Sequence, residues 1–298
     1  MKSFDYYAPK THREAVNLLS EHPGAKVLAG GTDLLVHMKL RVKTPEVIVD
    51  VGRILGANDL SVSRKQGLTI GSAVTMRRIE LSDAIWKTYA GFAQGASVVG
   101  SIQIRGLATV AGNVCNAAPS ADSAPGLISL GARVKIAGKN GRRTVQVENF
   151  MLGPGQTALR EGELVTGIHV PTPGPRTGSA YMRHTPRGAM DIAVVGVGAS
   201  ITLAARTGAC QAARIVLGAV APAPMRAKAA ERVLRGKQLS AELIEKAAEV
   251  AAGEARPISD VRASADFRRE MVAVLTRRMV TSAWEDAQAG AGSKRRAA

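Results

Sequence analysis

Residues 27–35 decide how this chain begins to fold; they read Val27-Leu28-Ala29-Gly30-Gly31-Thr32-Asp33-Leu34-Leu35. We expect a strand that ends at the two glycines and a helix that starts two residues later. Glycine permits a positive φ and has no Cβ to block close approach to the backbone. Successive N–H groups at such a turn, with the positive end of the new helix, can hold a phosphate oxygen. By itself the pattern fits a tight strand-to-helix turn equally well.

A second stretch offers similar chemistry farther along the chain. Residues 103–113 read Gln103-Ile104-Arg105-Gly106-Leu107-Ala108-Thr109-Val110-Ala111-Gly112-Asn113, and residues 115–122 continue with Cys115-Asn116-Ala117-Ala118-Pro119-Ser120-Ala121-Asp122. The Gly, Asn, Ser and Pro content predicts a long irregular segment from Gly100 to Asp122, which is uncommon in a compact domain unless it has a function. Two such loops from different subdomains would cover both phosphates of a diphosphate.

Other nucleotide-binding motifs are missing from the sequence. It contains no G-x-G-x-x-G, and the nearest match, Gly196-Val197-Gly198, lacks the third glycine. These two glycines stand in an alternating apolar strand pattern, which predicts close packing there. No Gly-Lys-Ser/Thr ending of a P-loop is present either. The sequence therefore disfavours a Rossmann NAD site and a P-loop nucleotide site.

The two small-residue stretches, in this order, resemble the FAD-binding medium subunit of molybdenum hydroxylases, the relatives of xanthine dehydrogenase and aerobic carbon monoxide dehydrogenase. The motifs on which this resemblance rests are Ala29 to Leu34, Ala108 to Asn113, and the run from Asn116 to Asp122. The resemblance covers about residues 1 to 285 and includes Asp191-Ile192-Ala193 at the start of the C-terminal domain.

The resemblance implies a role for each matching residue. Ala29, Gly30, Gly31, Thr32, Asp33, Leu34 and Leu35 would wrap the FAD pyrophosphate, and Thr109, Val110, Ala111, Gly112 and Asn113 would cover its other side. Asp122 matches an acidic residue that holds the adenosine end of the cofactor through a ribose hydroxyl. The strand Leu164-Val165-Thr166 matches one that lines the adenine pocket, and Arg183 stands where the family usually has a Lys near the adenosine portion.

The sequence departs from the family pattern at four points. Ile102 replaces a common Pro, Gly106-Leu107 replaces Asn-Arg, and Ala111 replaces a Gly. The added methyl of Ala111 is compatible with a nearby phosphate only if its φ stays negative. The region from Ser97 to Gly100 has no aromatic residue, where some relatives stack one on the flavin.

The implied fold class is α+β: a two-part FAD-binding domain of the vanillyl-alcohol-oxidase/PCMH type, followed by a smaller α+β C-terminal domain. We expect subdomains at residues 1–58 and 59–175, a C-terminal domain at 176–285, and a disordered basic tail at 286–298. Local patterns support this division, because Thr11 to Glu14 forms a capping box and residues 171–178 read as a Pro- and Gly-rich linker. The predicted elements are a helix at 33–40, helical structure over 79–99, a hairpin around 138–141, strands at 26–29, 47–51, 68–70, 164–170, 192–203 and 210–220, and helices near 240–252 and 263–282.

Composition narrows the function classes. The net charge of +16 permits nucleic-acid binding, but the basic residues are scattered and aromatic content is 3%, so a basic surface facing an acidic partner protein is the better interpretation. No apolar run approaches the ~20 residues of a membrane span, and the N-terminus does not resemble a signal peptide. Two distant cysteines cannot form a disulfide framework, which favours a reducing, cytoplasmic location.

Isolated reactive residues have ordinary interpretations. Cys115 is expected to be a buried small residue rather than a redox thiol, and the five histidines have no metal-ligand spacing, so no protein-bound metal is predicted. Asp33 can cap its helix, and His184 is assigned a surface or structural role rather than contact with the flavin. No multi-cysteine cluster indicates an iron–sulfur site in this chain.

The resemblance implies an FAD-carrying electron-transfer subunit. One partner, the large subunit, would hold the molybdenum cofactor and a second, the small subunit, the [2Fe-2S] clusters, as a dimer of heterotrimers. Electrons would leave for an external acceptor, with the flavin supplying the redox chemistry. Two alternatives remain open at this point: a stand-alone FAD-dependent oxidase or dehydrogenase, and a non-catalytic basic binding protein.

Overall fold

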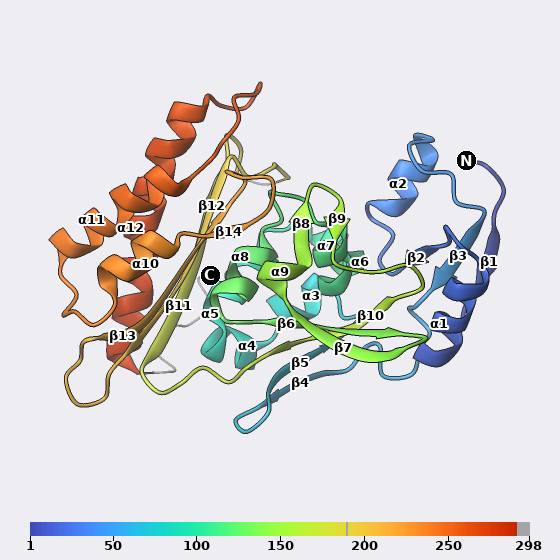
Figure 1. The fold of residues 1–298 in the computed structure, drawn as a ribbon, viewed down its shortest axis with the longest axis horizontal. Coiled ribbons are helices and arrows are strands. Elements are labelled where there is room, and N and C mark those ends of the chain that lie inside the picture. The colour runs from blue at the N-terminus through green and yellow to red at the C-terminus, as the bar shows by residue number, and fades with distance from the viewer. Residues whose placement is uncertain (189, 291–298) are drawn as a thin grey trace.

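The computed structural model describes residues 1–188 and 190–290, arranged as three units in a row (Figure 1). A small N-terminal unit lies at one end, a group of short helices over a sheet lies in the middle, and a sheet covered by long helices lies at the other end. The mixture of helices with mainly antiparallel sheets confirms the predicted α+β class.

The N-terminal unit is a three-stranded parallel sheet with α1 packed against it. Its strand order is β1-β3-β2, with bounds β1 Asp5–Tyr7, β2 Lys26–Leu28 and β3 Val47–Asp50, and its helices are α1 His12–Glu21 and α2 Leu34–Lys39. Thr11 caps α1 as predicted, because its Oγ1 accepts the amide of Glu14 at 3.1 Å. The Glu14 carboxylate accepts the amide of Lys10 at 2.8 Å, one residue before the usual capping-box position.

The central unit is built on a five-stranded antiparallel sheet of order β4-β5-β10-β6-β7. Its strands are β4 Leu60–Ser63, β5 Gly67–Gly71, β6 Arg133–Gly138, β7 Gly141–Gln146 and β10 Leu164–Val170, and a separate ribbon pairs β8 Met151–Gly153 with β9 Gln156–Thr157. The predicted hairpin is confirmed: Gly138 pairs with Gly141 across a two-residue turn, and Gly141 has φ +110°.

Seven helices of the central unit surround one apolar core above this sheet. They are α3 Met76–Glu80, α4 Asp83–Thr88, α5 Ala90–Ser97, α6 Ile102–Leu107, α7 Val110–Asn116, α8 Ser123–Ser129 and α9 Val147–Phe150. The prediction of a long irregular segment from Gly100 to Asp122 is therefore wrong. Helices α6 and α7 occupy most of this segment, and α7 packs on α8, whose Gly126 lies so close to α5 that a Cβ there would stand 2.6 Å from the carbonyl oxygen of Gly91.

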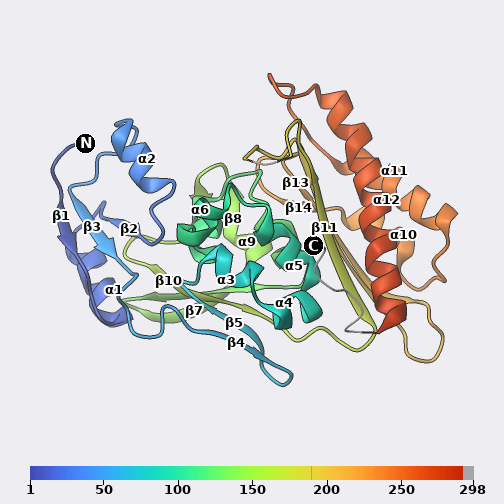
Figure 2. The ribbon, with the colours of Figure 1, turned by 180° about the vertical axis from the view of Figure 1, so that it is seen from behind.

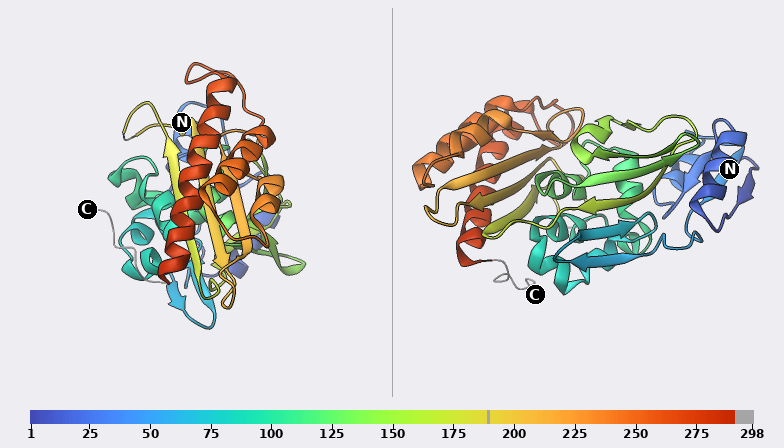
Figure 3. Two further views of the ribbon diagram at one scale, coloured as in Figure 1. Left: turned by 90° about the vertical axis from the view of Figure 1, so that its left-hand side faces the viewer. Right: turned by 60° about the horizontal axis from the view of Figure 1, so that its bottom comes forward.

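The C-terminal unit is a four-stranded antiparallel sheet between two layers of helices. Its elements are β11 Thr177–His184, β12 Val195–Leu203, β13 Cys210–Gly218, β14 Met225–Arg226, α10 Lys228–Leu234, α11 Ala241–Glu254 and α12 Ala265–Ala289. The three helices cover the outer face (Figure 3), whereas α5 and α8 contact the inner face and join this unit to the centre (Figure 2). The close packing predicted at Gly196 and Gly198 is confirmed, because a Cβ at Gly198 would stand 2.8 Å from Pro125.

Three sequence predictions for this unit need correction. Strands β11 and β14 and helix α10 were missed, and β12 begins at Val195 rather than at residue 192. The predicted disordered tail began at residue 286, but α12 continues to Ala289; residues 291–298 of that prediction lie outside the described part of the chain. None of the helices described here is long and apolar enough to span a bilayer.

Candidate functional site

A cavity of about 540 Å³ is lined by residues of all three units. It runs from Lys26 and Leu164, beside the N-terminal unit, to the segment Met190–Ile192 of the C-terminal unit. Thirteen of the predicted cofactor residues line it: Ala29, Gly30, Gly31, Thr32, Asp33, Leu34, Thr109, Ala111, Gly112, Asn113, Asp122, Leu164 and Val165. Both predicted loops therefore face the same cavity, although they lie far apart in the sequence.

The first loop presents main-chain donors to this cavity. The turn after β2 is made by Gly31, which has φ +72° and so adopts a conformation that side chains with a Cβ rarely take. In the described structure the amides of residues 31 to 34 donate to no protein acceptor. Gly31, Thr32 and Leu34 are half-buried and Asp33 is exposed, and four successive free donors beside a cavity fit a ligand with several acceptor oxygens.

Gly30 has a different role from Gly31. A Cβ at Gly30 would overlap the carbonyl oxygen of Leu107, at the end of α6. The missing side chain therefore allows the first loop to touch the second segment directly. This contact, rather than direct approach to a ligand, explains why position 30 is a glycine.

The second segment is a helix start rather than an open loop. Thr109 caps α7, because its Oγ1 accepts the amide of Gly112 at 2.9 Å, and the amide of Asn113 donates to the Thr109 carbonyl at 3.0 Å. The amide of Ala111 has no acceptor in the described structure. Ala111 is helical and has a negative φ, the backbone conformation in which its methyl group is compatible with a nearby phosphate. The second segment thus offers fewer free amides than the first.

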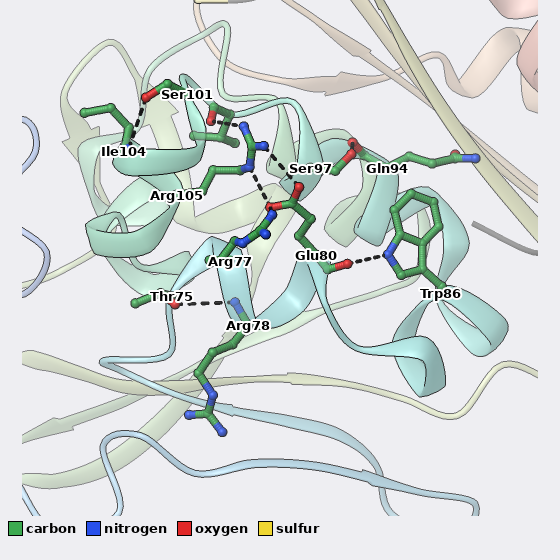
Figure 4. A network of polar contacts seen from close by, with 11 residues as sticks. Thr75, Arg77, Arg78, Glu80, Trp86, Gln94, Ser97, Ser101, Ile104 and Arg105 are labelled. Carbon is green, nitrogen blue, oxygen red and sulfur yellow. Dashed lines mark hydrogen bonds and ion pairs between the residues drawn. The ribbon is translucent and has the colours of Figure 1, made fainter. Parts of the chain in front are cut away.

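A buried ion pair fixes α6 beside the cavity (Figure 4). Arg105 Nε and Nη2 donate to the two carboxylate oxygens of Glu80 at 2.8 and 3.1 Å, and its Nη1 donates to the Val99 carbonyl at 3.2 Å. Burial raises the pKa of Glu80, but the hydrogen bonds from Arg105 and Arg77 outweigh it and hold the pKa below its ordinary value. The network ties α3 and α6 together and so sets the wall made by Val99, Gly100 and Ile104.

Asp122 is held by two side chains of β11. Its Oδ1 accepts the Tyr181 hydroxyl at 2.6 Å, and its Oδ2 accepts Arg183 Nη1 at 2.6 Å, with both ion-pair partners largely buried. Burial raises the pKa of Asp122 to about 6, against the opposing effect of Arg183 and Tyr181. A Cβ at Gly196 would stand 2.7 Å from the Tyr181 hydroxyl, so this glycine makes room for the network.

The structure separates two groups of residues that were both expected at the adenosine. Leu164 packs in the cluster that contains Ala15 and Val16 of α1. Asp122 is tied to β11, on the opposite side of the central helices from α1 (Figure 1). Leu164 and Asp122 therefore line opposite ends of the cavity.

Four predicted cofactor residues do not line the cavity: Leu35, Val110, Thr166 and Arg183. The Thr166 hydroxyl donates to the Lys135 carbonyl at 3.3 Å, and Val110 belongs to the central core. Arg183 contacts two residues of the cavity wall, because its Nη1 donates to Asp122 Oδ2 at 2.6 Å and to the Asp191 carbonyl at 3.1 Å.

The structure also places three residues that the sequence analysis considered singly, which are Asp33, Cys115 and His184. Asp33 stands at the N-cap position of α2, but its side chain makes no capping hydrogen bond, so the capping expectation is wrong. Burial raises the pKa of the Cys115 thiol to about 12, which agrees with an unreactive thiol, but Cys115 is half-buried and lines the cavity instead of being the buried residue expected. His184 contacts Phe267, with ring centroids 5.6 Å apart.

Sequence reasoning missed several residues of the site. Tyr181, Lys26, Lys43 and the segment Met190–Ile192 belong to it. Tyr181 precedes Arg183 by two residues, so on a strand both side chains share one face. This spacing could have identified Tyr181 only if residues 177–184 had been predicted as a strand.

Comparison with known proteins agrees with this architecture. Residues 2–173 match the family model described as the FAD binding domain in molybdopterin dehydrogenase, and residues 180–283 match the CO dehydrogenase flavoprotein C-terminal domain. The xanthine dehydrogenase FAD-binding subunit of Escherichia coli O157:H7 is 32% identical over 291 residues, covering 97% of each chain. The carbon monoxide dehydrogenase medium chain of Hydrogenophaga pseudoflava is 33% identical over 284 residues, covering 94% of this chain and 97% of the relative.

Solved structures show the same fold. Carbon monoxide dehydrogenase from Hydrogenophaga pseudoflava superposes with a TM-score of 0.90 at 32% identity, covering 95% of this chain and 98% of the other. Quinoline 2-oxidoreductase from Pseudomonas putida 86 superposes with a TM-score of 0.88 at 29% identity, covering 96% and 99%.

The fold and the cavity define a two-part flavoprotein domain with an α+β C-terminal domain. The chain belongs to the family of FAD-binding medium subunits of molybdenum hydroxylases, which confirms the resemblance seen in the sequence. It is a flavoprotein oxidoreductase subunit of the xanthine dehydrogenase and carbon monoxide dehydrogenase type.

Proposed function

We propose that this chain binds FAD across the cavity, with the diphosphate at the first loop. The main observation is that the amides of Gly31 to Leu34 donate to no acceptor within the described residues. These residues lie on the cavity wall, in a turn where Gly31 has a positive φ. Asp33 does not cap its helix, so its carboxylate is also available to a cofactor. The residues present therefore fit a dinucleotide.

The second segment covers the diphosphate from the other side. Ala111 contributes a free amide, and Asn113 keeps its side-chain amide for the ligand because its Oδ1 accepts the Ser123 hydroxyl at 2.7 Å. Gly112 lines the cavity, and a Cβ there would stand 2.8 Å from Thr109 Oγ1, the hydroxyl that caps α7, so a glycine keeps this cap undisturbed. Leu164 and Val165 supply apolar surface for the adenine at one end.

The opposite end of the cavity carries the Asp122, Tyr181 and Arg183 network. When bound, FAD supplies the redox chemistry, taking electrons from the iron–sulfur clusters of a small subunit and giving them to an external acceptor, while a large subunit holds the molybdenum cofactor. The contribution of this chain is binding, orientation and a dry, charged environment. We further propose a dimer of such heterotrimers and a cytoplasmic location, which the two free cysteines support.

Titration of the cofactor-free chain with FAD tests the binding proposal. Gly112→Val adds three carbons at the cavity wall and crowds the Thr109 cap of α7, and it is expected to weaken FAD binding at least about tenfold, a cost of about 1.4 kcal/mol. Gly106→Val controls for a valine in a neighbouring helix, because a Cβ there meets no atom within 4 Å and Gly106 does not line the cavity, and thermal unfolding of Gly112→Val shows whether that variant still folds. Equal affinities for the two variants, or a wild-type chain that refuses FAD, would contradict the proposal.

The electron-transfer role needs the assembled enzyme. Purification of the complex through a tag on this chain should yield flavin, iron and molybdenum together. Dehydrogenase activity of the isolated, FAD-loaded chain on a small substrate would instead favour a stand-alone oxidoreductase.

A further inference from the structure

Charged side chains on the cavity wall fall into two groups, those with an ion-pair partner and those without one. Three carboxylates are each paired with an arginine: Asp122 with Arg183, Glu163 with Arg143, and Asp191 with Arg187. Within the described residues, Lys26, Asp33 and Lys43 form no ion pair. Because the paired charges largely cancel, these three side chains set the charge that a ligand in the cavity meets.

The carboxylate of Asp33 lies in the first loop, whose free amides are assigned to the diphosphate. Each phosphate of a dinucleotide carries one negative charge. The Asp33 carboxylate therefore raises the electrostatic cost of holding the diphosphate in this loop, unless a cation lies nearby. The candidates are the two unpaired lysines of the wall.

Lys26 belongs to the adenine end of the cavity. It is the first residue of β2, and its neighbours Ala25 and Val27 pack against the apolar cluster that contains Leu164. Leu164 is one of the residues that supply apolar surface for the adenine. The charge of Lys26 is therefore placed beside the base rather than beside the diphosphate.

Lys43 is returned to the cavity by the turn that follows α2. The amides of Val42 and Lys43 donate to the His37 carbonyl at 2.9 and 3.2 Å, a bonding pattern that reverses the chain at the end of a helix. Leu34, the first residue of α2, lines the cavity, and so does Lys43, whereas residues 35–42 do not. The fold thus brings a distant lysine to the wall that the first loop forms.

We propose that the ammonium group of Lys43 binds the FAD diphosphate and offsets the charge of Asp33. The proposal rests on the proposed function, because that function places the diphosphate at the first loop. A lysine suits this role, since its ammonium is a compact charge with three donors on a flexible stem. Lys43 is exposed, so salt screens its attraction for the phosphates. FAD affinity should consequently decrease with ionic strength, and Lys43 should account for part of that decrease.

Titration of the cofactor-free chain with FAD at several salt concentrations tests the proposal. Lys43→Met removes the charge and keeps the apolar stem. Lys39→Met is the matched control, because Lys39 is also exposed and unpaired and lies in the same segment, but does not line the cavity. At about 20 mM salt, Lys43→Met should weaken FAD binding about fivefold, and at about 0.5 M salt the difference should fall below about twofold. Lys39→Met should bind FAD as the wild type does at both concentrations.

Three further variants show whether charge is the cause. Lys43→Arg keeps the positive charge and should retain the salt dependence of the wild type, whereas Lys43→Glu should bind FAD more weakly than Lys43→Met. Lys26→Met should lose less affinity than Lys43→Met, because Lys26 lies at the adenine end. All of these positions are exposed, so the cofactor-free variants should unfold at the temperature of the wild type.

Four results would overturn the proposal and leave the proposed function intact. They are an affinity of Lys43→Met equal to that of the wild type at low salt, a loss in Lys43→Met that does not change with salt, an equal loss in Lys39→Met, and a larger loss in Lys26→Met. If the wild-type chain binds no FAD at any salt concentration, the proposed function fails first and the assignment of Lys43 fails with it.

Discussion

The buried carboxyl of Asp122 makes a specific prediction about how stability depends on pH. Burial raises its pKa from 3.8 to about 6, so the folded chain binds this proton more tightly than the unfolded chain. Stability from this group is therefore fully present below pH 4 and decreases as the pH rises towards 6. A difference of about 2 between the two pKa values corresponds to roughly 3 kcal/mol.

Asp122→Asn isolates this effect from the other titrating groups. The asparagine is neutral at every pH, so the free energy of unfolding of the wild type minus that of the variant should fall by roughly 3 kcal/mol between pH 4 and pH 7. Guanidinium unfolding of the cofactor-free chain at several pH values, followed by tryptophan fluorescence, measures this difference. A difference that does not change with pH would refute the reasoning.

Tyr181→Phe probes the same carboxyl from its partner. The hydroxyl donates to Asp122 Oδ1 at 2.6 Å, and phenylalanine keeps the ring in place. Above pH 6 the lost bond is to a carboxylate and should cost about 2 kcal/mol; at pH 4 it is to a neutral acid and should cost about 1 kcal/mol. Equal costs at both pH values would show that Asp122 is not the group that titrates.

Three further predictions concern the walls of the cavity. Gly30→Ala should destabilise the chain by about 2 kcal/mol in thermal unfolding, because its Cβ overlaps the Leu107 carbonyl, whereas Gly106→Ala has free space and should be neutral or stabilising. Glu80→Gln should cost about 2 kcal/mol at pH 7 and less as the pH falls below 4, since the pKa of Glu80 is lowered and its contribution is lost on protonation. Cys115 lines the cavity and has a pKa of about 12, so at pH 7.5 it should react with a thiol reagent far more slowly in the folded chain than after unfolding.

Local features of the fold were predictable from the sequence. The capping hydrogen bond at Thr11 and the turn before Gly141 depend on residues within a few positions of each other, so short patterns found both. The same holds for the strand and glycine turn that end at Gly31.

Features that depend on distant contacts were missed or misread. The Gly, Asn and Pro residues between 100 and 122 lower the helix propensity of this segment, yet residues 102–107 and 110–116 are helical, with caps at Ser101 and Thr109 and with α6 packed on α3 and α7 on α8. The prolines and glycines at 171–178 concealed the start of β11 at Thr177.

In the candidate site, too, local features were predictable from the sequence and contacts between distant residues were not. Sequence motifs identified both glycine-containing segments, but the contact of Gly30 with Leu107 and the network of Tyr181 with Asp122 arise only when the three units assemble. Motifs therefore found the residues, while the folded chain determined which ends of the cavity they occupy.

A crystal structure of the FAD-saturated chain tests the central claim most directly. The predicted result is a diphosphate with oxygens within about 3.2 Å of the amide nitrogens of Gly31, Thr32 and Asp33, in contact with Gly112 on its other side. A flavin bound outside this cavity, or a diphosphate that leaves those amides unpaired, would contradict the account.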